Sequence, residues 1–475
     1  MPDLVTLVER NAAQSPRKPA VITARRSLTY SELLQRAAGA NPASEPPVSR
    51  QAVAGRDAVT VAVALLASAM AGGAVLMVDP AAPEAEAERA RATFGCGERG
   101  GSDLPAGLGL TTSGVTGEPR CVIRPWELVA ANAAAFAEAL ELAPDDVVMT
   151  TSSMHHSYAV SAGLCGTLAA GASFAAPGGM LTPKALAGCI DSHSVSVLLS
   201  VPILYRWYTV GVPAARAPRL CVSAGEAVDD ELRKAWEASV GWPLAEHYGT
   251  SELGQLTVAA PGDAGFGRPV RGVRIRIVPH AVDGVPDGAT VAGPASGGMV
   301  EVSVAGPPAV VLDAVDGQVT PRPLTGWQAT GDLGVMDRGG RVRIDGRVGD
   351  VVNVGGKKVA LPEVETALRA LPGVRDGAVI AQAGAGGVPK LHAFVVTGEE
   401  FSEAEAVALL KQDLAPHKVP RQVRRSHRTP ASSRGRQRRA GKCVPTSRRP
   451  PGREAATAVR REPQPCPPTA AAART

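Results

Sequence analysis

The sequence predicts an α/β protein with a large N-terminal domain of layered sheets and helices and a small α+β C-terminal domain. Between about residues 4 and 423, helical stretches rich in Ala and Leu alternate with short runs of Val and Ile. A segment rich in glycine and charge, 339–347, precedes a compact stretch with its own helix and strand patterns. The chain has 475 residues, and 45% of them are hydrophobic. A chain of this length usually divides into at least two domains, because single hydrophobic cores stop growing at shorter lengths.

These patterns place a domain boundary at 346–350, between an N-terminal domain of residues 1–346 and a C-terminal domain of residues 347–425. Segment 40–56 contains Pro and Ser and predicts a surface loop. The apolar run 59–78 is long enough to raise the question of a membrane span, but its internal Gly-Gly and the Asp-Pro after it favour a buried helix, a strand and a turn. Further strands are predicted at 195–201, 299–304, 378–381 and 390–396, and helices at 127–140, 229–240 and 362–371.

The net charge of +5 is distributed unevenly along the chain. Residues 426–475 contain twelve Lys or Arg and two Glu, a net charge of +10, so the first 425 residues carry −5. Arg, Pro and Ala dominate this tail and apolar periodicity stops, which predicts a disordered basic segment. We therefore expect no nucleic acid and no membrane as partners of the folded part.

The cysteines and the N-terminal residues favour a cytoplasmic location. The seven cysteines form no CxxC pair, so the sequence predicts neither a zinc site nor a disulfide framework. The first residues, MPDLV, lack the basic start and apolar run of a secretion signal.

A first candidate binding segment, 111–120, reads TTSGVTGEPR and precedes the predicted helix at 127–140. Glycine lets backbone N–H groups approach a phosphate closely, and hydroxyls with a cation complete such a cradle. An ordinary turn rich in Gly and Thr has the same composition, so this segment alone leaves both interpretations open.

Two later segments offer complementary chemistry. In 246–252, EHYGTSE, a tyrosine ring can face a nucleobase, a hydroxyl can bond phosphate, and a glutamate can hold Mg²⁺. In 327–334, followed by 346–350, Asp332 at a strand end can accept both ribose hydroxyls, and Arg347 can pair with phosphate. Taken singly, the first is equally consistent with a strand end and loop, and the second with a hairpin that carries solvated charges.

The three segments together, in this order and approximate spacing, resemble the superfamily of adenylate-forming enzymes. That superfamily includes acyl-CoA and aryl-CoA ligases, adenylation domains of peptide synthetases, and luciferases. The resemblance covers about residues 4–425 and extends to PAVI at 19–22, LTYSEL at 28–33, GGKKV at 355–359 and PEVE at 362–365. It implies that the small C-terminal domain rotates about a hinge near Gly349 between adenylation and thioester formation.

The resemblance also implies roles for individual residues. Segment 112–117 would hold the β- and γ-phosphates of ATP, Ser251 would contact the α-phosphate, Glu252 would carry Mg²⁺, and Asp332 with Arg347 would take the ribose. Such a set meets the demands of carboxylate attack on a phosphate, which are positioning and neutralisation of negative charge. The implied nucleotide-binding residues are Thr112, Ser113, Gly114, Thr116, Gly117, Arg120, Gly225, Glu226, Tyr248, Gly249, Asp332 and Lys357, and the implied catalytic residues are His156, Ser251, Glu252 and Arg347.

Segment 153–159, SMHHSYA, bears on the identity of the organic acid. It resembles the family segment that lines the acyl pocket, with His156 as its gate. Peptide-synthetase domains carry an Asp near here that pairs with the substrate ammonium, and this chain has none, so an α-amino acid is disfavoured. Segments 201–205, 220–227 and 414–421 resemble benzoate-type aryl-CoA ligases. We expect an aryl or acyl acid, and either CoA or the phosphopantetheine of a carrier protein as thiol acceptor.

Three positions depart from the family pattern. Val115 replaces the usual Ser or Thr of the phosphate loop, and Arg120 replaces the usual Lys. The C-terminal lysine of the family is expected near Arg436, where the sequence reads SRGRQRR, and the later Gly441-Lys442 lacks the family's Pro-Arg-Thr lead. We hypothesise a frameshift near Ser426, which an intact reading frame in independently sequenced DNA would refute. Without that lysine, adenylation should be slow and thioester formation from supplied acyl-adenylate retained.

Two alternatives remain beside the ligase interpretation. Val115 and the missing lysine favour a catalytically impaired protein that keeps the fold and binds a nucleotide or acyl group. A basic tail acting as an interaction or nucleic-acid arm is disfavoured by its low aromatic content and its bias toward Pro and Ala.

Overall fold

The computed structural model describes most of the chain up to residue 426, and the structural statements below concern these residues. The described ranges are 3–40, 50–55, 57–97, 104–112, 120–209, 217–241, 244–260, 263, 265–279, 297–315, 318–348, 351–354, 357–383, 389–398, 401–414 and 416–426.

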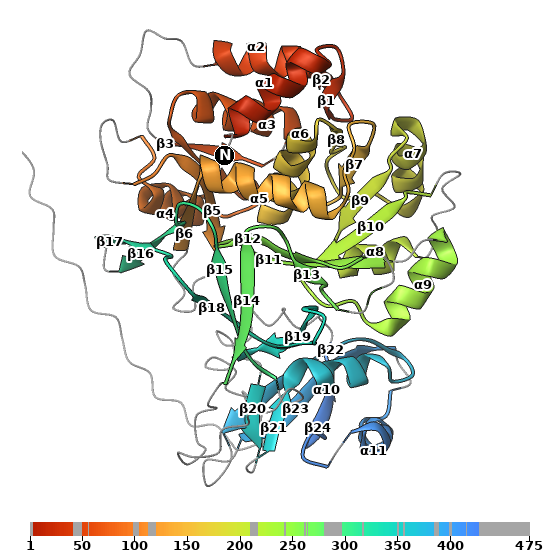
Figure 1. The fold of residues 1–475 in the computed structure, drawn as a ribbon. Helices are drawn as coiled ribbons and strands as arrows, with labels where there is room; N and C mark the ends of the chain where they lie inside the picture. The colour runs from red at the N-terminus through yellow and green to blue at the C-terminus, as the bar shows by residue number, and fades with distance from the viewer. Residues whose placement is uncertain are drawn as a thin grey trace, which may run out of the picture. The chain divides into compact units, whose positions relative to one another are not determined.

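A nine-stranded sheet forms the centre of the N-terminal part (Figure 1). Its six central strands are parallel to one another, and the strands added at both edges are antiparallel. The order is β13 (Arg268–Pro269), β12 (Gly254–Val258), β11 (Leu244–Thr250), β10 (Leu220–Ala224), β9 (Val197–Ser200), β7 (Val147–Thr150), β8 (Ser173–Ala175), β1 (Pro19–Ile22) and β2 (Ser27–Thr29).

Two further sheets complete this part of the protein. In the six-stranded sheet, β3 (Arg50–Ala54), β4 (Ala74–Val78) and β5 (Gly107–Thr112) are parallel, and the strands that continue it are antiparallel. These are β6 (Arg120–Pro125), β16 (Val310–Val315) and β17 (Gln318–Pro323). The four-stranded sheet is wholly antiparallel, in the order β14 (Val273–Val278), β15 (Gly298–Val304), β18 (Gln328–Met336) and β19 (Val342–Arg347).

Helices cover the sheets and bury their apolar faces against them. The largest hydrophobic cluster combines residues of α1, α2, α3, α5 and α6 with residues of the first strands, among them Leu4, Leu33, Leu65 and Phe174. Local signals set several helix starts: Thr29 and Glu32 form a capping box at α2, and the Asp229 side chain caps α9. The helices are α1 (Leu4–Gln14), α2 (Tyr30–Gly39), α3 (Ala58–Met70), α4 (Glu84–Phe94), α5 (Trp126–Ala139), the π-helix η1 (Tyr158–Cys165), α6 (Gly166–Ala170), α7 (Pro183–His193), α8 (Pro202–Tyr208) and α9 (Asp230–Val240).

The C-terminal part of the described chain buries a hydrophobic cluster of its own. The cluster includes Val364, Leu368, Val379, Leu410 and Val423, which are at most 1% exposed. These side chains come from two small sheets and two helices. The elements are β20 (Val351–Val354) with β21 (Lys357–Ala360), then β22 (Val374–Ala383) with β23 (Pro389–Thr397) and β24 (Gln422–Arg425), and the helices α10 (Leu361–Arg369) and α11 (Glu403–Asp413).

The structure confirms the predicted mixed α/β class and most of the predicted elements. The apolar run 59–78 divides into helix α3 and strand β4, as its Gly-Gly break indicated, and no helix of the described residues is long and apolar enough to cross a membrane. The predicted loop 40–56 is wrong in its second half, because Arg50–Ala54 form strand β3 beside β4. Arg50 can be buried there because its guanidinium donates a hydrogen bond to the carbonyl oxygen of Phe94 at 3.0 Å.

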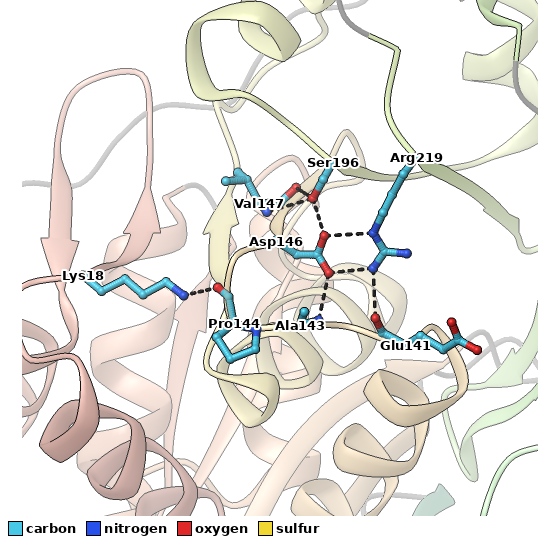
Figure 2. A network of polar contacts seen from close by, with 8 residues as sticks. All are labelled: Lys18, Glu141, Ala143, Pro144, Asp146, Val147, Ser196 and Arg219. Atoms are coloured by element: carbon cyan, nitrogen blue, oxygen red, sulfur yellow. Dashed lines mark hydrogen bonds and ion pairs between the residues drawn. The ribbon is translucent and has the colours of Figure 1, made fainter.

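A polar network stabilises the edge of the nine-stranded sheet at which its parallel strands begin (Figure 2). Asp146, Ser196 and Arg219 directly precede β7, β9 and β10. One oxygen of the Asp146 carboxylate accepts hydrogen bonds from Ser196 Oγ at 2.7 Å and Arg219 Nε at 2.9 Å. The other oxygen accepts from the Ala143 N–H at 2.9 Å and from Arg219 at 2.6 Å. The network thus aligns three neighbouring strands at their amino ends.

Replacing Asp146 with Asn should destabilise the protein by about 2–4 kcal/mol, because the Asp146 side chain is only 6% exposed and the substitution removes the anion that pairs with Arg219. Burial alone would raise the pKa of Asp146, but the hydrogen bonds from Arg219, Ser196 and Ala143 outweigh it and lower that pKa. This contribution is therefore present above about pH 4, the range of an unfolded Asp, and is lost as the pH falls through the lowered pKa.

Urea denaturation of both proteins between pH 7 and pH 3 measures this effect. Asp145→Asn is the matched control, because Asp145 is the exposed neighbour of Asp146. Equal midpoints for the Asp146 variant and the unmodified protein at pH 7 would contradict the structural role.

Candidate active site

The opposite edge of the same sheet, where the parallel strands end, collects the residues singled out in the sequence. Open α/β sheets bind ligands at the carboxyl ends of their strands. Here β7 leads to segment 153–159, β10 to Gly225 and Glu226, and β11 to Ser251 and Glu252. The predicted acyl segment and two predicted nucleotide segments therefore share one edge.

A buried carboxylate joins this edge to the four-stranded sheet. Asp332, which is 4% exposed, lies on β18 opposite Arg347 of β19. Its Oδ1 accepts a hydrogen bond from Arg347 Nε at 2.8 Å, and its Oδ2 accepts one from the hydroxyl of Tyr248, on β11, at 2.6 Å. Each carboxylate oxygen has a second lone pair, so Asp332 can still accept hydroxyl groups of a ligand. The structure thus brings together Tyr248, Asp332 and Arg347, which three separate segments supply.

Ser251 and Glu252 lie half-buried on the tight turn between β11 and β12. The Leu253 N–H closes this turn by donating to Thr250 Oγ1 at 3.0 Å. Burial alone would lower the pKa of Arg347, but the nearby charges of Asp332 and Glu252 and the hydrogen bond to Asp332 raise it, so the Glu252 carboxylate lies within electrostatic reach of Arg347.

Glu252 suits the magnesium role assigned to it. Mg²⁺ in nucleotide sites is commonly held by one or two carboxylates together with phosphate oxygens rather than by a complete protein cage. Within the described ranges, no three or more His, Cys, Asp or Glu side chains gather in a way that would hold a metal ion on their own. Glu252 is a single half-buried carboxylate within the predicted nucleotide segment 246–252, which is the donor type that such a shared coordination requires.

Gly249 is required by the close approach of two strands. A Cβ atom at this position would lie 2.6 Å from the carbonyl oxygen of Gly254 and 3.0 Å from Cε1 of His247. The backbone shifts register between Tyr248 and Gly249, which is a bulge in the pairing of β11 with β12. This local geometry turns the chain from the tyrosine that reaches Asp332 to the turn that carries Ser251 and Glu252.

Gly225 and Glu226 lie in the turn between β10 and α9. Glu246 of the neighbouring strand β11 holds that turn through hydrogen bonds. Gly225 adopts a φ of +94°, a conformation that favours glycine, and Glu226 is exposed. The Glu246 carboxylate, 2% exposed, accepts from the Val228 N–H at 2.8 Å and from Arg233 at 2.6 Å. Glu246 begins the EHYGTSE motif, and the structure gives it a positioning role that the sequence did not indicate.

The predicted phosphate loop connects β5 to β6, and only its two ends are described. Thr112 and Arg120 pair across the strands at the base of the loop. Arg120 Nε lies 2.7 Å from Oδ1 of Asp313 on β16, an ion pair without hydrogen-bond geometry, since that oxygen has no donor in a suitable direction. The remaining predicted loop residues, Ser113, Gly114, Thr116 and Gly117, and the side chain of Lys357 lie outside the described residues.

The two histidines of the predicted acyl segment differ in their surroundings. His156 is exposed, whereas His155 is half-buried, and their rings lie 3.9 Å apart. His155 Nδ1 lies 2.8 Å from Ser153 Oγ and 3.6 Å from a carboxylate oxygen of Asp79, which follows β4. Burial lowers the pKa of His155, and the charge of Asp79 opposes that effect. These contacts bring the ends of β4 and β7 together, so the two large sheets meet at this segment.

A fully buried arginine near this site was missed by the sequence reasoning. Arg124 on β6 donates to Ser161 and to Asn132, each at 2.9 Å, and Asn132 in turn bonds both the N–H and the carbonyl oxygen of Gln255 at 2.8 Å. Burial lowers the pKa of Arg124 to about 10, and its Nε has no hydrogen-bond partner among the described residues. The network supports the start of β12, directly after the turn that carries Glu252. A lone Arg in the apolar strand RCVIRP was the available signal.

Two family models match the chain, and the first covers the segments that carry His156, Tyr248, Ser251 and Glu252. Residues 109–295 match the model described as AMP-binding enzyme, and residues 363–436 match the AMP-binding enzyme C-terminal domain. The chain belongs to the AMP-binding, or adenylate-forming, superfamily.

Curated relatives of this adenylate-forming chain include ligases for aromatic acids. A benzoate–CoA ligase of Thauera aromatica is 27% identical over 329 residues, which are 66% of this chain and 61% of the relative. A p-hydroxybenzoic acid–AMP ligase, FadD22, of Mycobacterium tuberculosis is 31% identical over 323 residues, which are 66% of this chain and 44% of the relative. The match to the benzoate–CoA ligase thus spans about three fifths of that protein's length.

Two solved structures share the fold. ATP-bound MatB from Rhodopseudomonas palustris superposes with a TM-score of 0.74 at 23% identity, over 90% of this chain and 96% of that one. The anthranilate CoA ligase AuaEII in complex with anthranoyl-AMP gives a TM-score of 0.75 at 19% identity, over 93% and 97% of the two chains. The likeness at this identity establishes the adenylate-forming fold.

Replacing Gly249 with Ala should destabilise this adenylate-forming protein by about 1–3 kcal/mol, because the added Cβ meets a backbone oxygen that cannot move aside freely. Thermal or urea denaturation measures the change. Gly188→Ala is the matched control, since Gly188 lies in α7 with open space around it, and there alanine should be neutral or stabilising by up to about 1 kcal/mol. Equal stability of the Gly249 variant and the unmodified protein would show that the strands can separate without cost.

Proposed function

We propose that this protein activates an organic acid with ATP to form an acyl-adenylate and transfers the acyl group to a thiol. The observation that carries the proposal is the convergence of Tyr248, Asp332 and Arg347, from three segments of the chain, beside the turn with Ser251 and Glu252. Membership of the adenylate-forming superfamily supports the same reaction class.

In the proposed nucleotide complex, Asp332 accepts the ribose hydroxyls and Tyr248 lies beside the base. Ser251 contacts the α-phosphate, and segment 112–117 with Arg120 holds the β- and γ-phosphates. Gly225, Glu226, Gly249 and Lys357 complete the proposed contacts. ATP as cosubstrate is supported by the ATP-bound state of MatB, which has the same fold.

The chemical step joins two anions, and the residues of the site counter their repulsion. Arg347 brings a positive charge to the nucleotide, and Glu252 would hold Mg²⁺, which would neutralise phosphate charge when bound. The carboxylate oxygen of the acid attacks the α-phosphorus, the bond to the bridging oxygen breaks, and pyrophosphate leaves with that oxygen. A thiolate then attacks the acyl carbon, and AMP leaves. The turn between β11 and β12 fixes Ser251 and Glu252 for these steps, which lowers the cost of positioning.

The proposed acid is aromatic or another non-amino acyl acid, bound near segment 153–159 with His156 at the entrance. The names of the relatives, benzoate–CoA ligase and p-hydroxybenzoic acid–AMP ligase, support an aromatic acid. CoA or a carrier-protein phosphopantetheine is the proposed acceptor, and residues 347–425 are proposed as the domain that moves between the two half-reactions. The separate hydrophobic cluster of the C-terminal part supports such a domain.

Acid-dependent exchange of labelled pyrophosphate into ATP tests the proposal. A panel of benzoates, fatty acids and amino acids should give exchange with at least one aryl or acyl acid and with no α-amino acid. An alternative function is nucleotide or acyl binding without catalysis, which the missing C-terminal lysine motif supports. That alternative predicts that calorimetry detects ATP binding and that no acid supports exchange. A protein that shows neither ATP binding nor exchange would contradict both functions.

Asp332→Asn should raise the KM for ATP at least about tenfold, because a charge-assisted hydrogen bond contributes about 1.5–3 kcal/mol. The exchange assay at varied ATP measures this change. Asp345→Asn is the matched control, since Asp345 also pairs with an arginine, Arg343, but at an exposed position of β19. An unchanged KM for the Asp332 variant would contradict the proposed contact between Asp332 and the ribose.

Asp313→Asn should lower the KM for ATP, because Asp313 now offsets the charge of Arg120 at the base of the phosphate loop. The pair is partly exposed, with side-chain exposures of 38% for Arg120 and 27% for Asp313, so a change of about two- to fivefold is expected. Arg120→Met should raise the KM and remove the effect of the Asp313 substitution. If Asp313→Asn leaves the KM unchanged in the presence of Arg120, Arg120 does not act on the phosphates.

A further inference from the structure

The guanidinium of Arg124 lies where β6, α5, η1 and β12 meet. Arg124 belongs to β6 and is fully buried, and its two terminal nitrogens donate to different helices. Nη1 donates to the hydroxyl of Ser161, on η1, at 2.9 Å, and Nη2 donates to the amide oxygen of Asn132, on α5, at 2.9 Å. The planar guanidinium serves both directions at once, which an apolar side chain on β6 could not do.

The start of β12 packs against this guanidinium. Asn132 accepts from the Gln255 N–H at 2.8 Å and donates to the Gln255 carbonyl oxygen at 2.8 Å. The residue before it, Gly254, has a φ of +83°, and a Cβ atom there would lie 2.3 Å from Nη2 of Arg124 and 2.2 Å from Oδ1 of Asn132. Only glycine allows the backbone to come this close. The chain that leaves the turn with Glu252 is therefore placed by Arg124 and Asn132.

A charged side chain at this position of β6 needs an explanation. With its pKa lowered to about 10 by burial, Arg124 still carries a charge at neutral pH. The residues before it on the strand, Cys121, Val122 and Ile123, are buried and apolar. An apolar residue would continue this pattern without the cost of removing a charge from water. A positioning role accounts for the arginine, because its fork reaches α5, η1 and β12 together.

The network connects the two segments that the proposed site assigns to the phosphates and to Mg²⁺. Arg124 lies on the strand that directly follows the phosphate segment 112–120 and pairs with β5, which leads into that segment. Gly254 begins β12, directly after the turn with Ser251 and Glu252. ATP with its Mg²⁺ would contact both segments at once, so its affinity depends on how precisely they are placed relative to each other.

We propose that Arg124 is a positioning residue, which holds the Ser251–Glu252 turn in a fixed place relative to the phosphate-loop strand and thereby sets the affinity for ATP with its Mg²⁺. This inference rests on the proposed nucleotide site. Arg124 itself touches neither the nucleotide nor the metal in this role, because β6, α5, η1 and β12 enclose it. AMP lacks the β- and γ-phosphates, needs no metal and would meet the turn only through Ser251. Its affinity should therefore depend on Arg124 far less than the affinity of ATP does.

Calorimetric titration with AMP in the absence of metal, and with α,β-methylene-ATP and Mg²⁺, tests the proposal. Arg124→Met removes the fork and keeps a long side chain. It should weaken binding of the ATP analogue at least about tenfold and binding of AMP less than about threefold, as expected for a residue that orients a metal ligand. Arg124→Lys should recover part of the loss, because an ammonium group can still donate hydrogen bonds there but lacks the planar fork.

Two further variants separate positioning from a general loss of stability. Asp146→Asn is the matched control, because it also breaks a buried polar network, but at the opposite ends of the parallel strands. It should leave the ratio of the two dissociation constants unchanged. Ser161→Ala is the milder test, since it removes one acceptor of the guanidinium, and should shift that ratio by about two- to threefold in the same direction as Arg124→Met. It decides the question if Arg124→Met does not fold.

A double-mutant cycle with Glu252→Gln locates the effect at the metal. Mn²⁺ replaces Mg²⁺, and electron paramagnetic resonance measures its binding to the complex of protein and ATP analogue. Each single substitution should weaken Mn²⁺ binding. Arg124→Met should weaken it little further once Glu252→Gln is present, because Arg124 acts through Glu252. Losses that multiply in the double variant would contradict a route through Glu252.

The titrations distinguish this inference from the proposed reaction. If an acid supports exchange but Arg124→Met weakens AMP and the ATP analogue equally, or neither, the ligase function stands and the positioning role is wrong. If no acid supports exchange but Arg124→Met selectively weakens the ATP analogue, the proposed reaction fails and the positioning role stands. An unmodified protein that binds neither nucleotide would overturn both.

Discussion

The Asp332 carboxylate lies almost fully buried between two donors that come from different parts of the chain. A carboxylate in such a place is costly unless it is paired and hydrogen-bonded, and here Tyr248 and Arg347 meet that requirement from two separate sheets. The end of β11 must therefore stay beside β18 and β19. The turn with Ser251 and Glu252 follows β11 directly, so the same contact also fixes the residues that the proposed chemistry uses.

The two ends of the parallel strands in the nine-stranded sheet have different roles. At the edge where its parallel strands begin, Asp146, Ser196 and Arg219 satisfy one another and leave little polar capacity for a ligand. At the edge where the strands end, the Asp332 carboxylate keeps a second lone pair on each oxygen for a ligand. Stability and ligand binding are thus separated along the strands, and a destabilised site edge can be tolerated because the other edge aligns the same strands.

Local patterns predicted the fold class, and motif order predicted the residues that meet at Asp332. The break in the apolar run 59–78 is a local signal, and the structure contains the helix and the strand that it indicates. Strand β3 was missed because its polar residues match a loop composition, and its burial depends on a hydrogen bond from Arg50 to distant Phe94. The Arg124 network was missed for the same reason, since it depends on residues that lie elsewhere in the chain, such as Ser161 and Gln255.

A crystal structure of the protein with AMP or a non-hydrolysable ATP analogue would test the central claim most directly. The account predicts one nucleotide with its ribose hydroxyls within hydrogen-bond distance of Asp332, its base beside Tyr248, and its phosphates between segment 112–120 and the Ser251–Glu252 turn. A nucleotide bound elsewhere, or one whose ribose leaves Asp332 untouched, would contradict it.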